Sequence, residues 1–342
     1  MIYLIVCLFI ILLGYIEILE NSRVSASLYG IFVAFIMVAM AALRTNVGPD
    51  WQAYYEFYIH GAEGTEAGYH FLNDLFFEFG IHYNVFLLFI NTLSLILIYL
   101  GLQKHAKFLI FPILLFYCEL FLYFNFSGIR QALAISLTIY STRFIITRSF
   151  WKFLAIVVLA TYFHNTAIVF IIAYFIPFRK LTKKEYFILL LGFLLFSTLI
   201  FSIVNLLSGS LAAKAMYYLE FQERDPNIKS LFVIGTIKRT MIIVLVLFFG
   251  KKMLEDKNSI FFFNIYLIGF GMYLATYLIS ADIGVRLSSY FLIFDLFLAG
   301  NLLSANYKLT TRLLIATILS LIALYKITTY MAMETYTYHW IF

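Results

Sequence analysis

Basic residues in or beside long apolar runs are the first feature of this sequence that could do chemistry. They are Arg44, Arg130, Lys238, Arg239 and Arg286. A guanidinium group binds phosphate oxygens in pairs, and a charge inside a membrane is costly unless it has a function. A single arginine could instead reach the lipid headgroups, or pair with an acid such as Asp50, Glu119 or Asp282. As a set, and because Lys238 and Arg239 lie deep in a run, they predict a site for a polyanionic ligand.

His164 is the second such feature, because it is the only one of six histidines within a long apolar run. A histidine in a membrane span is often bonded to a backbone carbonyl. Imidazole also titrates near neutrality, as a proton acceptor should. Both a structural and a catalytic role therefore stay open for His164.

Acidic and aromatic residues occur together in the polar segment 44–83. Asp50 and Trp51 follow a Gly-Pro turn, and Glu66 precedes Tyr69 by three residues. Carboxylates can bind sugar hydroxyls, and aromatic rings can stack on pyranose faces. Trp and Tyr also concentrate at membrane interfaces whatever the function of the protein. The segment is consistent with carbohydrate binding without requiring it.

Several other classes of site are not indicated. The sequence has no zinc-type spacing of His, Cys and Glu, no Asp-x-Asp pair and no glycine-rich phosphate loop, so we expect no metal, nucleotide or other cofactor. Cys7 and Cys118 lie in apolar runs, which suits small buried side chains better than a disulfide. The net charge of +6 is typical of basic cytoplasmic loops, and we expect no nucleic-acid partner.

The elements that must position these residues follow from composition. The 342 residues are 63% hydrophobic and 12% charged, against about 45–50% and 25% in soluble proteins. This apolar content would fill about ten or eleven spans of about 20 residues each. The runs are continuous rather than alternating, which disfavours a β-barrel. We predict an all-α, polytopic integral membrane helical bundle with about 10–12 spans.

The spans and their orientation can be read from apolar runs and basic connectors. The predicted spans are 1–19, 24–43, 84–102, 108–124, 129–146, 185–207, 231–250, 259–280, 284–303 and 310–330. Short basic connectors should be cytoplasmic, which places both termini and the long segments 44–83 and 208–230 outside. We expect short interfacial helices in 44–83 and at 211–222. No linker or repeat divides the chain, so 1–342 is predicted to be one transmembrane domain.

The run 153–177 does not fit this pattern, because basic connectors flank both of its ends. Its 25 residues are too few for two full crossings of about 20 residues each. We favour a re-entrant or broken hairpin, interrupted near 163–165. One long tilted helix, with another span misassigned, is the alternative.

Four short motifs carry a resemblance to a known family. They are Arg44…Gly48-x-Asp50-Trp51-x-x-Tyr54, Glu66-x-Gly68-Tyr69, Gly128-Ile-Arg130-Gln131-Ala-Leu-Ala134 and Ala160-Thr-Tyr-Phe163-His164-Asn165-Thr166. Together they resemble the EpsG family of polysaccharide polymerases, a branch of the Wzy-type repeat-unit polymerases. Trp51 and the inserted Pro49 depart from the family's usual Gly-x-Asp-Tyr pattern. A later motif around Arg286 also resembles the family, so the match covers roughly 44–290.

The resemblance implies a multi-pass glycosyltransferase of the bacterial cytoplasmic (inner) membrane. Such enzymes join oligosaccharide repeat units carried on undecaprenyl pyrophosphate at the outer face, in O-antigen, capsule or exopolysaccharide biosynthesis. A chain-length regulator is a further partner that the resemblance allows. A flippase for lipid-linked oligosaccharide and a glycan ligase are the alternative functions.

The resemblance also suggests roles for the residues singled out above. Arg130, Arg239 and Arg286, with Arg44, would bind pyrophosphate. His164, Asp50 and Glu66 compete as the proton acceptor for the acceptor hydroxyl, and we rank His164 first if the hairpin tip reaches the outer site. The remaining predicted substrate-binding residues are Trp51, Tyr54, Tyr69, Gln131, Lys238 and Asp282.

Overall fold

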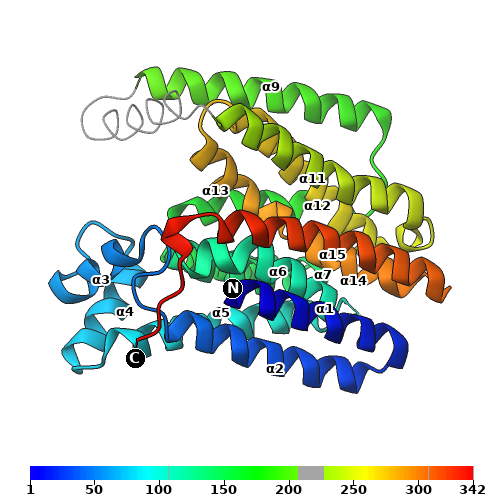
Figure 1. Ribbon diagram of the computed structural model, residues 1–342. Coiled ribbons are helices and arrows are strands. Elements are labelled where there is room, and N and C mark those ends of the chain that lie inside the picture. Colours follow the sequence, from blue (N-terminus) through cyan, green and yellow to red (C-terminus); the bar gives the residue numbers. More distant parts are fainter. Residues whose placement is uncertain (107, 207–226, 307, 342) are drawn as a thin grey trace. The chain divides into compact units, whose positions relative to one another are not determined.

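The computed structural model of the protein describes residues 1–106, 108–206, 227–306 and 308–341 (Figure 1). In these ranges every regular element is a helix, and a single isolated β-bridge joins Arg44 to Trp340. The predicted all-α class is confirmed. The predicted amphipathic segment 211–222 lies outside the described residues.

Seven helical segments of the described ranges, one of them made of two consecutive helices, are long and apolar enough to cross a membrane. They are α1 (Ile2–Glu20), α2 (Arg23–Ala42), α5 (Tyr83–Leu102), α11 (Ile228–Phe249), α12 (Lys257–Thr276), the consecutive pair α13 (Ala281–Leu292) and α14 (Asp295–Ala305), and α15 (Leu309–Met331). The chain is therefore a multi-pass membrane protein. A further long helix, α9 (Lys183–Leu206), coincides with the span predicted at 185–207.

Two predicted spans have unusual features. The span at 108–124 consists of α6 (Ile110–Phe116), which continues directly into the π-helix η1 (Tyr117–Asn125). The span at 129–146 is α7 (Ile129–Ile146), which carries many polar residues. Because α7 packs against both α5 and α8 (Phe150–Thr161) and buries most of its side chains, these polar groups face protein. Burial against protein is what makes polar groups tolerable at membrane depth.

The chain forms two compact units. Unit 1 comprises Met1–Tyr174 and Leu296–Phe342, and unit 2 comprises Phe175–Asp295. In unit 1, α1 packs against α2, α6 and α15, while α5 packs against α2 and α7. In unit 2, α12 packs against α9 and α13, and the short helix η3 (Met253–Glu255) adjoins α12. A single transmembrane domain over 1–342 stays a prediction.

The run 153–177 forms a hairpin. Its first leg is α8, and its second leg is the 3₁₀ helix η2 (Asn165–Phe175), with three residues between them. Phe153 near the start of the first leg stacks on Tyr174 near the end of the second, with 5.4 Å between ring centroids. The legs are therefore antiparallel, and the predicted break near 163–165 is confirmed.

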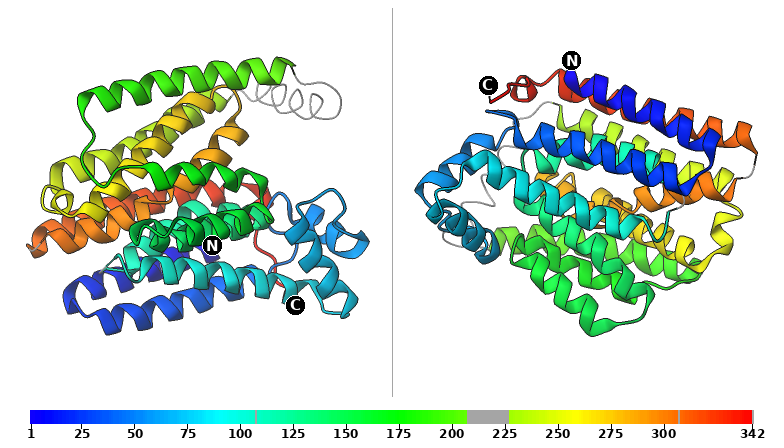
Figure 2. Two further views of the ribbon diagram at one scale, coloured as in Figure 1. Left: turned by 180° about the vertical axis from the view of Figure 1, so that it is seen from behind. Right: turned by 90° about the horizontal axis from the view of Figure 1, so that it is seen from below.

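The segment 44–83 contains two short helices, α3 (Trp51–His60) and α4 (Ala67–Glu78), as expected. Figures 1 and 2 show both beyond the same end of unit 1 as the tail that follows α15. That tail contains the 3₁₀ turn η4 (Glu334–Tyr336). The segment 44–83 and the C-terminal tail therefore lie at the same end of unit 1.

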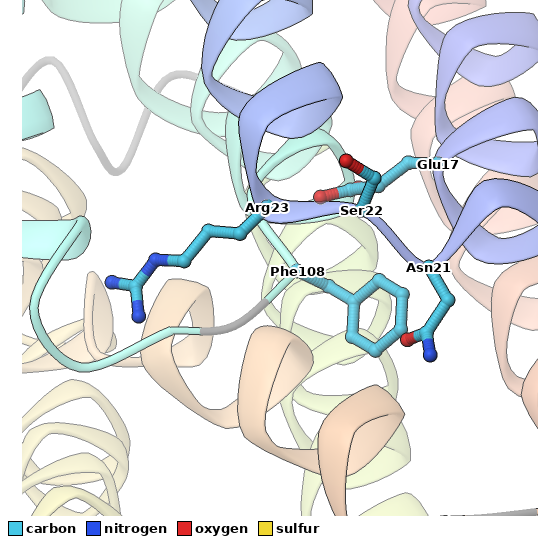
Figure 3. A pocket seen from close by; sticks show the side chains of 5 residues that line it. All are labelled: Glu17, Asn21, Ser22, Arg23 and Phe108. Atoms are coloured by element: carbon cyan, nitrogen blue, oxygen red, sulfur yellow. The ribbon is translucent and has the colours of Figure 1, made fainter.

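A small hollow marks the opposite end of unit 1 (Figure 3). It is lined by Glu17, Asn21, Ser22, Arg23 and Phe108. The Glu17 carboxylate accepts the backbone N–H groups of Leu109 and Ile110, at 2.6 and 3.0 Å. Because these donors begin α6 and have no partner inside that helix, Glu17 acts as its N-terminal cap. We therefore assign the hollow to the packing of the end of α1 against the start of α6.

Candidate active site

A single carboxylate joins three separate parts of unit 1. Glu66, directly before α4, accepts from Arg130 Nη1 of α7 and from His164 Nδ1, the latter at 3.1 Å. The backbone N–H of Asn165 adds a bond of 3.3 Å to the same carboxylate oxygen as His164. The Glu66 side chain is 9% exposed. The structure thus brings three of the four predicted catalytic residues into direct contact.

The hairpin tip reaches this cluster because Gly68 lets it approach. The Gly68 N–H donates to the Tyr162 carbonyl oxygen at 2.8 Å. A Cβ at position 68 would lie only 2.8 Å from that oxygen and 3.0 Å from Tyr162 Cβ. The tip thus contacts the segment 44–83, which the sequence predicts to lie outside the membrane.

The bond to Glu66 determines which nitrogen of His164 can accept a proton. An ionised carboxylate only accepts hydrogen bonds, so Nδ1 must carry the hydrogen of the pair. In the neutral ring, Nε2 then keeps its lone pair. This nitrogen is buried and has no hydrogen-bond partner among the described residues. His164 is therefore arranged as a proton acceptor at Nε2.

Glu66 itself is poorly suited to accept a proton. Its burial favours the protonated form, but the hydrogen bond to His164 and the charge of Arg130 outweigh burial and lower the pKa of Glu66 to about 2. A carboxylate of such low pKa is a weak base at neutral pH. Its geometry suits orienting His164 and Arg130, which favours His164 and Asp50 as the competing acceptors.

Arg130 is held on two of its three nitrogens. Nη1 bonds to Glu66, Nε donates to the Tyr54 hydroxyl at 3.2 Å, and the Tyr69 ring centroid lies 5.8 Å from the guanidinium carbon. In the described part of the chain Nη2 has no partner, and the side chain is 22% exposed. Arg130 can thus offer a ligand the Nη2 edge, rather than the two-pronged grip the sequence suggested.

Three of the predicted substrate-binding residues are aromatic side chains on α3 and α4, namely Trp51, Tyr54 and Tyr69. All three are buried, at 8%, 6% and 1% exposure. Tyr54 and Tyr69 pack edge to face, and Trp51 stacks on Tyr55 with 5.3 Å between centroids. The Tyr54 and Tyr69 ring centroids lie 5.7 and 5.8 Å from the Arg130 guanidinium carbon, so their geometry suits holding Arg130, whereas Trp51 packs on Tyr55.

Arg44 differs from the expectation of a pyrophosphate ligand. It is 1% exposed, and its guanidinium donates to the backbone carbonyls of Ala41, Val47, Asn125 and Phe126. Asn125 ends η1, where carbonyls lose their helical partners. All three nitrogens of Arg44 are engaged with carbonyls, so we assign it to holding this segment and not to substrate contact.

Asp50 has a partner that sequence reasoning missed. Its Oδ2 accepts from the Ser127 hydroxyl at 2.6 Å, and the carboxylate is half-buried. Ser127 directly precedes the motif that contains Arg130, which is the one sequence signal that could have pointed to it. Gln131, next to Arg130, is buried at 1% exposure.

The other predicted ligands lie in unit 2. The Arg239 guanidinium sits 3.7 Å from the Tyr273 ring centroid and donates to the Gly235 carbonyl at 2.9 Å. Arg286 Nε donates to Asp282 Oδ1 at 2.8 Å, one helical turn away. Lys238 adjoins Arg239 on α11. These residues stay predicted ligands.

The model of the EpsG family matches residues 27–340. The chain belongs to the EpsG family. No curated protein and no solved structure matches it. EpsG proteins form a Wzy-type polymerase-like family, so the resemblance seen in the short motifs is confirmed over nearly the whole chain. A membrane role in polysaccharide biosynthesis follows for this EpsG protein.

The described part of this EpsG protein contains no cluster of side chains that could bind a metal ion. No group of three or more His, Cys, Asp and Glu side chains there could hold an ion. The Glu66 cluster combines one acid with an arginine and a histidine, a set suited to binding anions and moving protons.

Replacing Gly68 by alanine in the EpsG protein should separate the hairpin tip from Glu66. The added methyl would meet the backbone of Tyr162, which cannot rotate away. We expect the rate of polysaccharide production by cells that depend on this protein to fall at least about tenfold, because small displacements of catalytic groups are costly. Gly192→Ala is the control, since nothing lies within 4 Å of its added methyl. Equal rates for Gly68→Ala and the wild type would contradict the role of the tip.

Glu66 should also stabilise the EpsG protein over a defined pH window. A carboxyl whose pKa falls on folding stabilises the fold above its unfolded value of about 4.3. That contribution is lost as pH falls towards about 2. We expect the wild type to unfold at a higher temperature than Glu66→Gln at pH 5, and the two unfolding temperatures to converge as pH falls from about 4 towards about 2. A wild-type advantage that is still undiminished at pH 2, or one that is absent at pH 5, would contradict the low pKa.

Proposed function

We propose that this EpsG-family chain is a membrane glycosyltransferase. It polymerises oligosaccharide repeat units carried on undecaprenyl pyrophosphate, at the outer face of the bacterial cytoplasmic membrane. The observation that supports this most is the joint attachment of Arg130 and His164 to Glu66. One carboxylate thereby places a cation with a free N–H edge beside an imidazole with a free lone pair.

The first half of the reaction is departure of the carrier. The bond between the anomeric carbon of the growing glycan and its pyrophosphate oxygen breaks, and the electron pair leaves with the pyrophosphate. Arg130 would bind that developing charge through Nη2, while Glu66 and Tyr54 keep the guanidinium in place. One well-placed donor of this kind contributes about 2.7–4 kcal/mol to lowering the barrier.

The second half is attack by the incoming unit. A sugar hydroxyl of that unit forms the new bond to the anomeric carbon and transfers its proton to His164 Nε2. The imidazolium that results carries its other hydrogen on Nδ1, towards the Glu66 carboxylate 3.1 Å away. The negative charge of Glu66 stabilises this imidazolium, and a positioned base of this type contributes about 10²–10⁴-fold to the rate.

Asp50 keeps a second role in the proposal. With Oδ2 bonded to Ser127, its other oxygen can accept a hydrogen bond from a sugar hydroxyl. Arg239 and Arg286 of unit 2, with Lys238, are proposed to contact the pyrophosphate of a carrier, and Asp282 is proposed to contribute to substrate binding by orienting Arg286. O-antigen, capsule and exopolysaccharide are all polymers that such chemistry can make.

A reconstitution experiment tests the function. The purified protein is placed in lipid vesicles with a synthetic undecaprenyl-pyrophosphate-linked repeat unit. We expect a ladder of polymer lengths on a gel and release of free carrier. Substrate that crosses the bilayer unextended would indicate a flippase, and a single transfer of glycan to a different lipid would indicate a ligase. Either result would overturn the polymerase proposal.

A further inference from the structure

The tail after α15 lies along the segment that carries Asp50. After the turn η4, it runs antiparallel to residues 43–45, and Figure 1 shows the two side by side. The Thr45 N–H donates to the His339 carbonyl at 3.0 Å, and the Ile341 N–H donates to the Leu43 carbonyl at 2.9 Å. The tail is thus a structural part of this end of unit 1.

Tyr336 is the buried residue of that tail, at 3% exposure. Its hydroxyl donates to the Leu122 carbonyl of η1 at 3.0 Å. The preceding residue, Thr335, accepts the Gly48 N–H at 2.8 Å. Two adjacent tail residues therefore hold both the Gly48 turn and the π-helix η1.

These two held segments each carry one member of a polar pair. Asp50 follows Gly48 by two residues, and Ser127 follows the end of η1 by two. Gly48 has φ of +98°, and a Cβ there would lie 2.3 Å from the Phe126 carbonyl oxygen. The turn thus packs directly on the chain before Ser127, and the pair meets at 2.6 Å.

The Tyr336 hydroxyl remains a donor in this setting. Its burial, followed by the neighbouring tyrosines Tyr123 and Tyr3, raises its pKa well above the usual range, and the Asp50 carboxylate acts in the same direction. A phenol that stays protonated keeps its bond to the Leu122 carbonyl throughout the physiological range.

We propose that Tyr336 is a positioning residue for Asp50. It holds the Gly48 turn and the end of η1 in fixed positions relative to each other. Ser127 can then bind one carboxylate oxygen of Asp50 while the other oxygen faces the sugar. Tyr336 does not touch the substrate. This inference rests on the proposed function, because the value of a fixed Asp50 lies in binding the incoming glycan.

The kinetic test uses two variants that each remove one hydroxyl. Tyr336→Phe removes the bond to Leu122. Tyr338→Phe is the matched control, because it removes a 2.8 Å bond from the same tail to the Met40 carbonyl. We expect kcat for polymer formation to fall about fivefold to tenfold in Tyr336→Phe, the size expected for one lost hydrogen bond, and to change little in the control. Equal effects of the two variants would overturn the proposal.

A double variant shows whether Tyr336 acts through Asp50. Adding Tyr336→Phe to Asp50→Asn should cause no further loss of rate, because the group being positioned is already lost. Losses that multiply in the double variant would show that Tyr336 acts elsewhere. Asp50→Asn alone provides the reference rate.

A labelling experiment separates this inference from the proposed function. Ser127→Cys places a thiol beside Asp50, and the native Cys7 and Cys118 are fully buried, which keeps background labelling low. Tyr336→Phe should speed maleimide labelling of that thiol, while Tyr338→Phe should not. This readout needs no polymer, so it tests the position of Ser127 even if the reconstituted protein makes none. Unchanged labelling in Tyr336→Phe would overturn the positioning role.

Discussion

We expect His164→Ala to lower kcat for polymer formation by about 10²–10⁴-fold, the range that a positioned general base contributes. The reason is the Nε2 lone pair, which the bond of Nδ1 to Glu66 leaves free and buried. The measurement is the initial rate of polymer formation by the purified protein at saturating substrate. KM should change far less than kcat, because the proton is transferred only during the reaction.

Two further variants sharpen the His164 experiment. Glu66→Gln keeps the shape of residue 66 but removes its charge. Its rate of polymer formation should therefore lie between those of the wild type and His164→Ala. His70→Ala is the control, because His70 lies on α4, near Glu66, and forms an exposed pair with Asp74 at 2.8 Å. A full rate in His164→Ala would show that Asp50 or another group accepts the proton.

The second large effect is expected for Arg130→Lys, with a loss in kcat of about 10²–10³-fold. Lysine keeps the positive charge, but a single ammonium group cannot bond Glu66 and Tyr54 together and still offer a third N–H edge to pyrophosphate. The same polymerisation assay measures it. Arg130→Ala should be worse, because it leaves the buried Glu66 carboxylate without its cation.

Arg143→Lys is the matched control for this charge-conserving change. Arg143 lies in the last turn of the same helix, where it donates to the Tyr140 hydroxyl and stands over the Tyr140 ring. We expect little change in polymer yield there. Full polymer length in Arg130→Lys would contradict the role of Arg130 in binding the leaving group.

The membrane helices and the hairpin could be predicted because both depend on local sequence. Apolar runs of the right length define the spans, and basic connectors on both sides of 153–177 implied that the chain turns back. The π-helix η1 was not predicted, since nothing in its nine residues distinguishes it from an ordinary apolar helix.

The roles within the site depend on contacts between distant parts of the chain. Glu66 meets Arg130 across 64 residues and His164 across 98. From the sequence Glu66 is a candidate base, whereas its contacts with Arg130 and His164 suit it to orienting these two side chains. No local sequence pattern encodes those contacts. The sequence could not show what holds Arg44 for the same reason, because the carbonyls that it binds at Asn125 and Phe126 are 81 and 82 residues away.

We propose that the Glu66 cluster forms glycosidic bonds while releasing the carrier. The most direct measurement counts new glycosidic bonds and released undecaprenyl pyrophosphate in one reaction, with purified wild type and His164→Ala compared at equal concentration. We expect equal numbers of bonds and carriers for the wild type, and a large and parallel fall in both for the variant. Polymer formed by His164→Ala at the wild-type rate, or carrier released by the wild type without new bonds, would contradict it.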